Sequence, residues 1–258
     1  MPGVTLLEAR GLTVEVADYT VCRGLDLALY PGECWGMLGV NGAGKTTLLH
    51  TLAGLHPART GSVLLDGLSR TQLGRRGWAQ RLGVVFQDES DPFPSTVLES
   101  TLIGRHPHLG RFGWETESDY ALAREALAAM DLVALEQRET VTLSGGERQR
   151  LRMAAFLTQD TPIGLLDEPT NHLDPAHQMR LFSLLVARAH ARAGTLLMAL
   201  HDVNLVARFC DHCLLLYGNG DTTAGPVTEV LTVASLQRLY RHPLVAVNAP
   251  WGQGWLPA

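Results

Sequence analysis

The chain has 258 residues and a mass of 28.0 kDa, which is enough for one large α/β domain. Its residues are 46% hydrophobic and 18% charged, as is typical of a packed globular protein. The formal net charge of −5 argues against general nucleic-acid binding, which needs a basic surface. No apolar run approaches the ~18 residues of a membrane span. The charged residues Glu8 and Arg10 stand where a signal peptide would need an unbroken apolar segment. We therefore expect a cytosolic protein that attaches to a membrane only through a partner.

The first segment of the chain, residues 4–33, alternates apolar and polar side chains. This pattern predicts antiparallel strands with turns near Asp18 and at Pro31-Gly32. Tyr19 lies on the first of these turns. Its ring could stack on a nucleobase or pack against the protein surface, and the residue pattern leaves both interpretations open.

A glycine-rich loop follows the apolar run 34–38, which predicts a buried strand, and precedes residues 46–54, which predict a helix. The loop matches G-x-x-x-x-G-K-S/T at every fixed position and reads Gly39-Val40-Asn41-Gly42-Ala43-Gly44-Lys45-Thr46-Thr47. Backbone N–H groups in such a loop surround a phosphate, and the helix dipole adds partial positive charge. We predict that Lys45 contacts the β- and γ-phosphates and that the Thr46 hydroxyl binds Mg²⁺. The chain is therefore expected to bind a nucleoside triphosphate.

Residues 82–86 form an apolar run that predicts a strand ending at Gln87. Ligands of α/β proteins bind at such strand ends, which would give Gln87 a ligand to contact. The alternative is a loop glutamine that has no role in binding. The sequence pattern changes after this strand. Helical patterns follow, notably over 120–130 with an N-cap at Asp119. We predict a helical subdomain at 88–159, inserted in an α/β core formed by residues 1–87 and 160–258.

Another helix of this subdomain begins at Leu143-Ser144-Gly145-Gly146-Glu147. Ser144 and Glu147 have the spacing of a capping box, which explains the helix start by itself. A capping box does not need two glycines, however. Gly145 and Gly146 permit a close backbone approach at a helix N-terminus, which indicates a second anion site.

Two adjacent acids, Asp167 and Glu168, end the next apolar strand. Neighbouring carboxylates repel each other unless a cation shares the site, so we predict that Asp167 binds Mg²⁺ and Glu168 polarises a water molecule. A further strand over 195–200 ends at His201. Because the carboxyl ends of the strands in a doubly wound sheet meet in one crevice, we expect five polar residues at the triphosphate. They are Lys45, Gln87, Asp167, Glu168 and His201.

Cys210 and Cys213 form a C-x-x-C pattern, which can belong to a redox or metal site. They stand at the entry to an apolar strand, and no second C-x-x-C completes a zinc site. We interpret them as two small, half-buried hydrophobic residues.

Together these motifs resemble those of the ATP-binding subunits of ABC transporters over nearly the whole chain, and the most specific one is Leu143–Glu147. The resemblance implies a P-loop NTPase core with a mostly parallel sheet, an N-terminal antiparallel β subdomain and an inserted helical subdomain. It implies catalytic roles for Glu168 as base, His201 at the γ-phosphate, Gln87 and Lys45. It implies Mg²⁺ contacts for Thr46, Gln87 and Asp167. It implies ATP contacts for Tyr19, Gly39, Asn41, Gly42, Ala43, Gly44, Lys45, Thr46, Thr47, Ser144, Gly145, Gly146 and Asp174.

The same resemblance implies a head-to-tail dimer in which Ser144–Gly146 of one copy close over the ATP of the other. Residues 104–108 and 201–208 look like those of the importers of iron-siderophores, haem and vitamin B12. The implied partners are a second copy of the chain, a polytopic membrane permease and, indirectly, a substrate-binding protein. The implied location is the cytoplasmic side of the cell membrane. The alternative is a soluble ABC ATPase that serves a non-transport complex.

Overall fold

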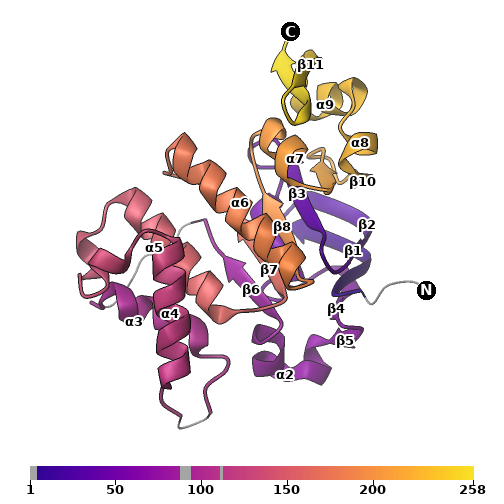
Figure 1. Ribbon diagram of the computed structural model, residues 1–258. Helices are drawn as coiled ribbons and strands as arrows, with labels where there is room; N and C mark the ends of the chain where they lie inside the picture. Colours follow the sequence, from indigo (N-terminus) through magenta and orange to yellow (C-terminus); the bar gives the residue numbers. More distant parts are fainter. Residues whose placement is uncertain (1–4, 88–93, 111–112) are drawn as a thin grey trace.

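The computed structural model describes residues 5–87, 94–110 and 113–258, which form two larger sheets, a terminal hairpin and several helices (Figure 1). The first sheet is antiparallel, with the strand order β2-β1-β4-β5. Its strands are β1 (Leu7–Val16), β2 (Tyr19–Leu29), β4 (Thr60–Leu65) and β5 (Leu68–Ser69). This sheet is the antiparallel unit that the alternation of residues 4–33 predicts.

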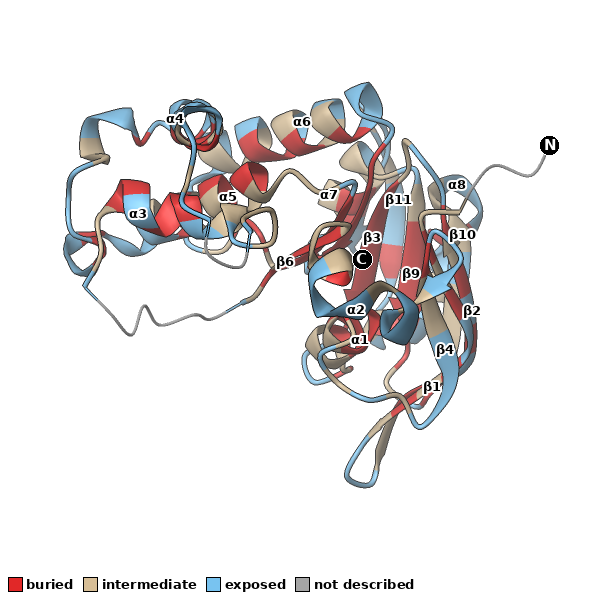
Figure 2. Cartoon of the chain, turned by 90° about the horizontal axis from the view of Figure 1, so that it is seen from below, coloured by how far each residue is buried: buried red, intermediate tan, exposed pale blue. Residues whose placement is uncertain are grey.

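The second sheet has the order β10-β9-β3-β8-β7-β6, and its neighbouring strands are parallel except at β10, which runs antiparallel to β9. Its strands are β3 (Cys34–Gly39), β6 (Leu82–Val85), β7 (Ile163–Asp167), β8 (Thr195–Ala199), β9 (His212–Leu216) and β10 (Thr222–Pro226). Every residue of β3, β7 and β8 is buried, because elements cover both faces of the sheet (Figure 2). The predicted α/β class with a mostly parallel sheet is confirmed.

The helices divide into two groups by their place in the chain. Those between β6 and β7 gather to one side of the sheet (Figure 1) and are α3 (Val97–Leu102), η1 (Ile103–Arg105), α4 (Glu117–Ala129), η2 (Val133–Leu135), η3 (Thr140–Thr142) and α5 (Gly145–Gln159). The others are α1 (Lys45–Leu52), α2 (Arg70–Ala79), α6 (Pro175–Ala191), α7 (Val203–Phe209), α8 (Val227–Val230) and α9 (Val233–Tyr240). The chain closes with the hairpin β11 (Leu244–Ala249) and β12 (Gly252–Pro257). The domain boundaries at 88 and 160 stay a prediction, and residues 88–93 lie outside the described residues.

Two hydrophobic cores lie on opposite faces of the parallel sheet. One fills the space between this sheet, α1 and the antiparallel sheet, where Leu12, Leu48 and Leu214 are fully buried. The other joins α6, α7 and the helices between β6 and β7, with Phe182 and Leu127 fully buried. Because both faces of the sheet are packed, its strand ends are held in fixed positions.

The predicted N-cap of α4 is wrong by three residues. Thr116 caps the helix, and Asp119 is its third residue, with each side chain bonded to the other's backbone N–H. In this T-x-x-D capping box, two backbone N–H groups that lack a helical partner donate to side-chain oxygens. A cap at Asp119 would not satisfy both groups. No helix of the described ranges combines the length and apolarity that spanning a bilayer requires.

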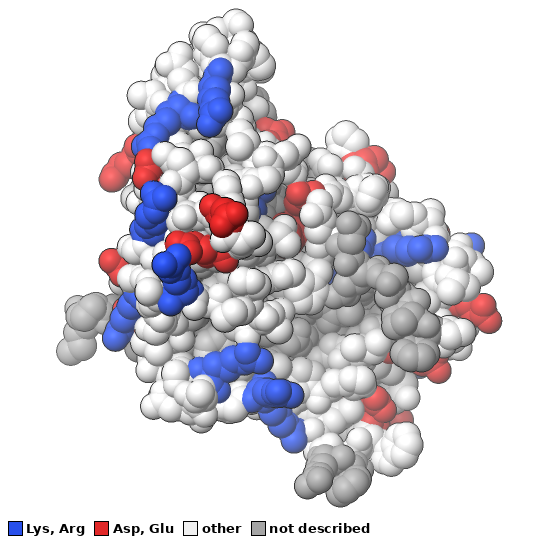
Figure 3. Space-filling model, turned by 180° about the vertical axis from the view of Figure 1, so that it is seen from behind, with Lys and Arg blue, Asp and Glu red and all other residues white. Residues whose placement is uncertain are grey.

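Most ion pairs are exposed, and on the rear face basic side chains lie among acidic ones (Figure 3). The pair Arg105–Asp119 differs, because its side chains are only 12% and 8% exposed and its Nε–Oδ1 distance is 2.7 Å. Arg105 also donates to the Thr158 carbonyl, so the pair joins η1, α4 and α5. A backbone hydrogen bond from Thr116, with help from Arg105, lowers the pKa of Asp119 to about 2.

We expect Asp119→Asn to lower the free energy of unfolding by about 2–3 kcal/mol at neutral pH, because it leaves the buried Arg105 charge without a carboxylate partner. The pKa of Asp119 in the folded chain lies below the ordinary 3.8. The stability that this carboxylate contributes is therefore present above pH 3.8 and is lost as the pH falls towards 2. Urea unfolding at several pH values checks it. Asp131→Asn is the matched control, because the exposed Arg180–Asp131 pair should contribute under about 1 kcal/mol. Equal losses in the two variants would contradict the assignment.

Candidate functional site

The glycine-rich loop leaves the carboxyl end of β3 and enters α1 at Lys45. Gly44 precedes the helix with a φ of 92°, and a Cβ there would lie 2.6 Å from Val21, so only glycine fits. The first N–H groups of α1 have no intrahelical partner and face the loop. The loop and three side chains from other strand ends line a cavity of about 570 Å³. The lining residues are Asn41, Gly42, Ala43, Gly44, Lys45, Thr46, Thr47, Gln87, Glu168 and His201.

Lys45 places a buried ammonium group at the base of this cavity. The side chain is 7% exposed, and its Nζ donates to the Gly39 carbonyl at 2.8 Å. Burial lowers the pKa of Lys45, while the charges of Glu168 and Asp167 oppose that shift. The cavity therefore holds one cation between two acids and the N-terminus of α1, an arrangement that suits a ligand with several negative charges.

Asp167 ends β7 and is buried next to the loop. Neither of its carboxylate oxygens accepts a hydrogen bond of ordinary geometry from a described residue. Burial raises the pKa of Asp167, and the neighbouring Thr46 hydroxyl opposes this rise. A buried carboxylate without donors, next to a hydroxyl, fits a hard cation such as Mg²⁺, which takes oxygen ligands.

Glu168 lies one residue further on, in a left-handed backbone conformation with a φ of 48°. Such a conformation is uncommon for a residue with a Cβ and is found at functional sites. Its Oε2 accepts a hydrogen bond from Gln87 at 3.0 Å and another from Asn171, and its Oε1 contacts His201 Nε2. Burial alone would raise the pKa of Glu168, but Asn171, His201 and the Lys45 charge outweigh it and lower the pKa. The carboxylate is therefore held ionised and oriented at the cavity.

Four of the five strand-end residues predicted at the triphosphate, Lys45, Gln87, Glu168 and His201, line the cavity, whereas the buried Asp167 lies behind the lining. Several of the residues predicted to contact ATP, Gly39 among them, are also outside the lining. Tyr19 packs against the core beneath the antiparallel sheet and does not line the cavity. Asp174 caps α6 by accepting from the His177 N–H. The segment Ser144–Gly146 also lies outside the cavity lining.

Ser144 caps α5 and forms the predicted capping box with Glu147. Ser144 and Gly145 are exposed, and a Cβ on Gly146 would lie 3.1 Å from the His172 carbonyl of the same chain. The helix start that the sequence marks as an anion site therefore lies outside the cavity lining of its own chain and next to the segment that follows Glu168.

Three contacts near the site are not predicted from the sequence. Asn171 donates to Glu168, and Gln149 donates to the Pro169 carbonyl at 2.7 Å from a fully buried position. His50 lies close enough to Asp167 for its charge to lower that pKa. Asn171 stands three residues after Glu168, a spacing that a tight turn brings together, and this is the signal that could have found it.

Comparison with known proteins gives a consistent set of relatives. The pattern of the ABC transporter family matches residues 22–171. The hemin import ATP-binding protein HmuV of Pseudomonas aeruginosa is 42% identical over 253 residues, which cover 92% of this chain and 96% of that protein. The ferric enterobactin transport ATP-binding protein FepC of Escherichia coli is 34% identical over 96% of this chain and 91% of its own length.

Two further similarities extend this set. The cobalamin import ATP-binding protein BtuD of Halobacterium salinarum is 36% identical over 91% of this chain, but the match spans only 58% of that longer relative. Among solved structures, an inward-facing ABC transporter proposed to be of the metal-chelate type has a TM-score of 0.85 and 29% identity, with 98% of both chains covered.

Proposed function

We propose that this chain, which belongs to the ABC transporter family and is an ATPase, powers the import of an iron-siderophore, haem or cobalamin. The observation that carries the proposal is the gathering of Lys45, Glu168 and His201 around one cavity at the phosphate loop. The substrate class rests on the relatives, which are named for the import of hemin, ferric enterobactin and cobalamin.

The cavity suits ATP hydrolysis through the chemistry of its own side chains. The loop N–H groups and Lys45 bind the phosphates, and Thr46, Gln87 and Asp167 would hold Mg²⁺. When bound there, Mg²⁺ would neutralise part of the negative charge of the phosphates. Glu168, held ionised by its neighbours, orients water and accepts its proton, while His201 contacts both Glu168 and the γ-phosphate.

A second copy of the chain completes each site in this proposal. Ser144 and Gly145 are exposed at the start of α5, a 15-residue helix with its N-terminal N–H groups available to an anion. Since these residues lie outside the cavity of their own chain, they would close over ATP bound by another copy, in a head-to-tail dimer. ATP binding then closes the dimer and hydrolysis reopens it.

A membrane permease would dock in a groove beside β6. This groove has a volume of about 490 Å³ and is lined by Phe86, Ile103, Val141 and Arg148, among others. Ile103 and Val141 are 54% and 53% exposed, which is unusual for two apolar side chains lining one groove. The groove lies next to Gln87, so a permease helix seated there would sense the ATP cavity. A substrate-binding protein would act indirectly, through the permease, and the chain would sit on the cytoplasmic face of the membrane.

Co-purification from detergent-solubilised membranes tests the transport assignment. We expect tagged protein to retain a strongly apolar partner with many spans, identified by mass spectrometry. Ile103→Asp should abolish this co-purification and leave the ATPase activity of the isolated chain intact, because it charges the groove without touching the cavity. Leu55→Asp is the control, since Leu55 is 56% exposed and lies outside the groove. If only soluble partners are found, the chain serves a non-transport complex instead.

A further inference from the structure

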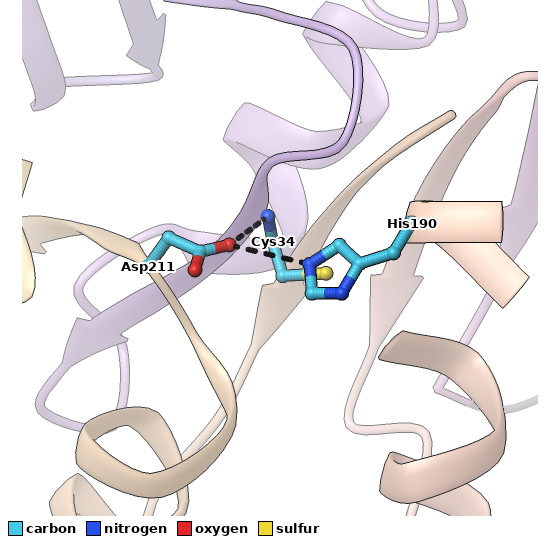
Figure 4. Close-up of side chains that lie close together, drawn as sticks. All are labelled: Cys34, His190 and Asp211. Carbon is cyan, nitrogen blue, oxygen red and sulfur yellow. Dashed lines mark hydrogen bonds and ion pairs between the residues drawn. The ribbon is translucent and has the colours of Figure 1, made fainter. Parts of the chain in front are cut away.

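Three possible metal ligands from distant parts of the chain meet at the end of the parallel sheet opposite the nucleotide cavity (Figure 4). Cys34 is the first residue of β3, Asp211 directly precedes β9, and His190 lies in the last turn of α6. Because β3 rises about 3.3 Å per residue, the cluster lies roughly 16 Å from the start of the phosphate loop. It is therefore separate from the ATPase machinery.

The ligand atoms of the three residues already lie close together. One atom from each residue is within 4.8 Å of the other two, and His190 Nε2 stands 3.9 Å from Asp211 Oδ2. The backbone N–H of Cys34 donates to the same Oδ2 at 2.9 Å, which fixes the direction of the carboxylate (Figure 4). The Asp211 N–H in turn donates to the Cys34 carbonyl at 2.8 Å. Two of the contacts of this cluster are thus set by backbone N–H groups before any ligand binds.

The burial of the three side chains is graded. Cys34 is fully buried, whereas His190 and Asp211 have half-exposed side chains. Among the described residues Asp211 has no arginine or lysine partner, and its Oδ1 accepts no hydrogen bond. Burial raises the pKa of the Cys34 thiol to about 12, with a smaller contribution from Asp211. The cluster therefore offers sulfur on its inner side and nitrogen and oxygen on its solvent side.

We propose that Cys34, His190 and Asp211 form a binding site for a Zn²⁺ ion. Zinc accepts sulfur, nitrogen and oxygen together, in a tetrahedron with bonds of roughly 2.0–2.3 Å. Ligand atoms that lie within 4.8 Å of one another need to move by only about 1 Å to meet those bond lengths. The fourth position faces solvent beside His190 and Asp211 and is open to water.

The two cysteines of the C-x-x-C pair lie near this site but are not among its proposed ligands. Cys210 is partly buried and packs against the core, as predicted, whereas Cys213 is fully buried in it rather than half-buried. Burial, followed by the nearby Cys34, Cys213 and Asp211, raises the pKa of Cys210 well above its usual range. The thiol that joins His190 and Asp211 is Cys34, which the C-x-x-C pattern does not include.

A bound ion would link α6, β3 and β9, and it would stabilise the folded chain by mass action. Zinc titration of the tag-free, chelator-treated full chain tests the site, with excess Mg²⁺ and ADP present to occupy the cavity near Glu168 and His201. We expect one equivalent of Zn²⁺ per chain. Cys34→Ser, His190→Gln and Asp211→Asn should each weaken binding by more than the ~10–100-fold that loss of an outer-shell partner costs.

Two control variants are matched to the test. Cys22→Ser removes another fully buried thiol, and His177→Gln removes another histidine that contacts an aspartate. Neither should change zinc affinity. His190→Gln and Asp211→Asn alter half-exposed side chains, so their folding is expected to survive even if Cys34→Ser disturbs the core.

Substitution with Co²⁺ gives a second readout, since a thiolate ligand produces a sulfur-to-cobalt charge-transfer band in the near ultraviolet. We expect this band in the parent chain and in both controls, and its loss in Cys34→Ser. Zinc should raise the unfolding temperature of the parent but not that of His190→Gln. Failure of the folded parent to bind zinc, or unchanged affinity in His190→Gln and Asp211→Asn, would overturn the proposal.

Discussion

Glu168→Gln is expected to lower the ATPase turnover number by about 10²–10⁴-fold, the usual contribution of a positioned general base. Glutamine keeps the size of the side chain and can still accept hydrogen bonds from Gln87 and Asn171. It loses the negative charge and the ability to take a proton from water. ATP binding should persist, because the loop N–H groups and Lys45 are untouched, so the ATP-bound dimer should accumulate.

Steady-state phosphate release and light scattering with and without ATP measure the two effects of Glu168→Gln separately. The control is Glu229→Gln, which removes an exposed acid of α8 far from the cavity lining. Because the neighbours of Glu168 hold its pKa below the ordinary 4.5, protonation of this group should affect the parent's turnover only below that pH. Turnover of the glutamine variant at the parent's rate would disprove the base assignment.

The phosphate loop and the strand-end residues could be predicted from the sequence because their signals are local. The loop pattern specifies its own strand, turn and helix, and Gln87, Asp167, Glu168 and His201 each end an apolar run. Parallel topology then brings such ends to one edge, whatever the loops between them do. The same logic predicts the helix start at Ser144, where a capping box lies within four residues.

Features that depend on tertiary packing could not be predicted in this way. Tyr19 stands on the predicted turn, and the structure packs it against the core between the two sheets. The hydrogen bond between Gln149 and the Pro169 carbonyl joins two segments 20 residues apart across a buried contact. Cys34, His190 and Asp211 are more remote still, and only the pairing of β3 with β9 and the end point of α6 bring them together.

Removal of the Lys45 charge should weaken ATP binding by roughly 10- to 100-fold, because a charge-assisted hydrogen bond contributes about 1.5–3 kcal/mol. Lys45→Ala tests this, and Lys45→Met tests it again with the volume of the buried stem retained. Nucleotide titration monitored by calorimetry measures the affinity directly. Undiminished affinity in both variants would contradict the role of the loop as a phosphate site.

Lys45 is the only lysine in the sequence, since every other basic side chain except histidine is arginine. A compact ammonium fits the buried position next to the Gly39 carbonyl, which a planar guanidinium would not. An ATP analogue with an amine-reactive acyl phosphate can therefore label only Lys45 or the chain's amino terminus. We expect the label on the peptide that contains Lys45 and its loss when unmodified ATP competes. Labelling confined to the amino terminus would place the phosphates elsewhere.

The Lys45 variant also tests whether one site is built from two chains. Ser144→Arg should block the exposed helix start that closes over ATP in the proposed dimer, while its own phosphate loop stays intact. A mixed dimer of Lys45→Ala and Ser144→Arg then combines one intact loop with the intact Ser144 segment of the other chain. Turnover of the mixture above that of either variant alone requires this composite site. Turnover equal to the average of the two would mean that each chain completes its own site, and the head-to-tail arrangement would be wrong.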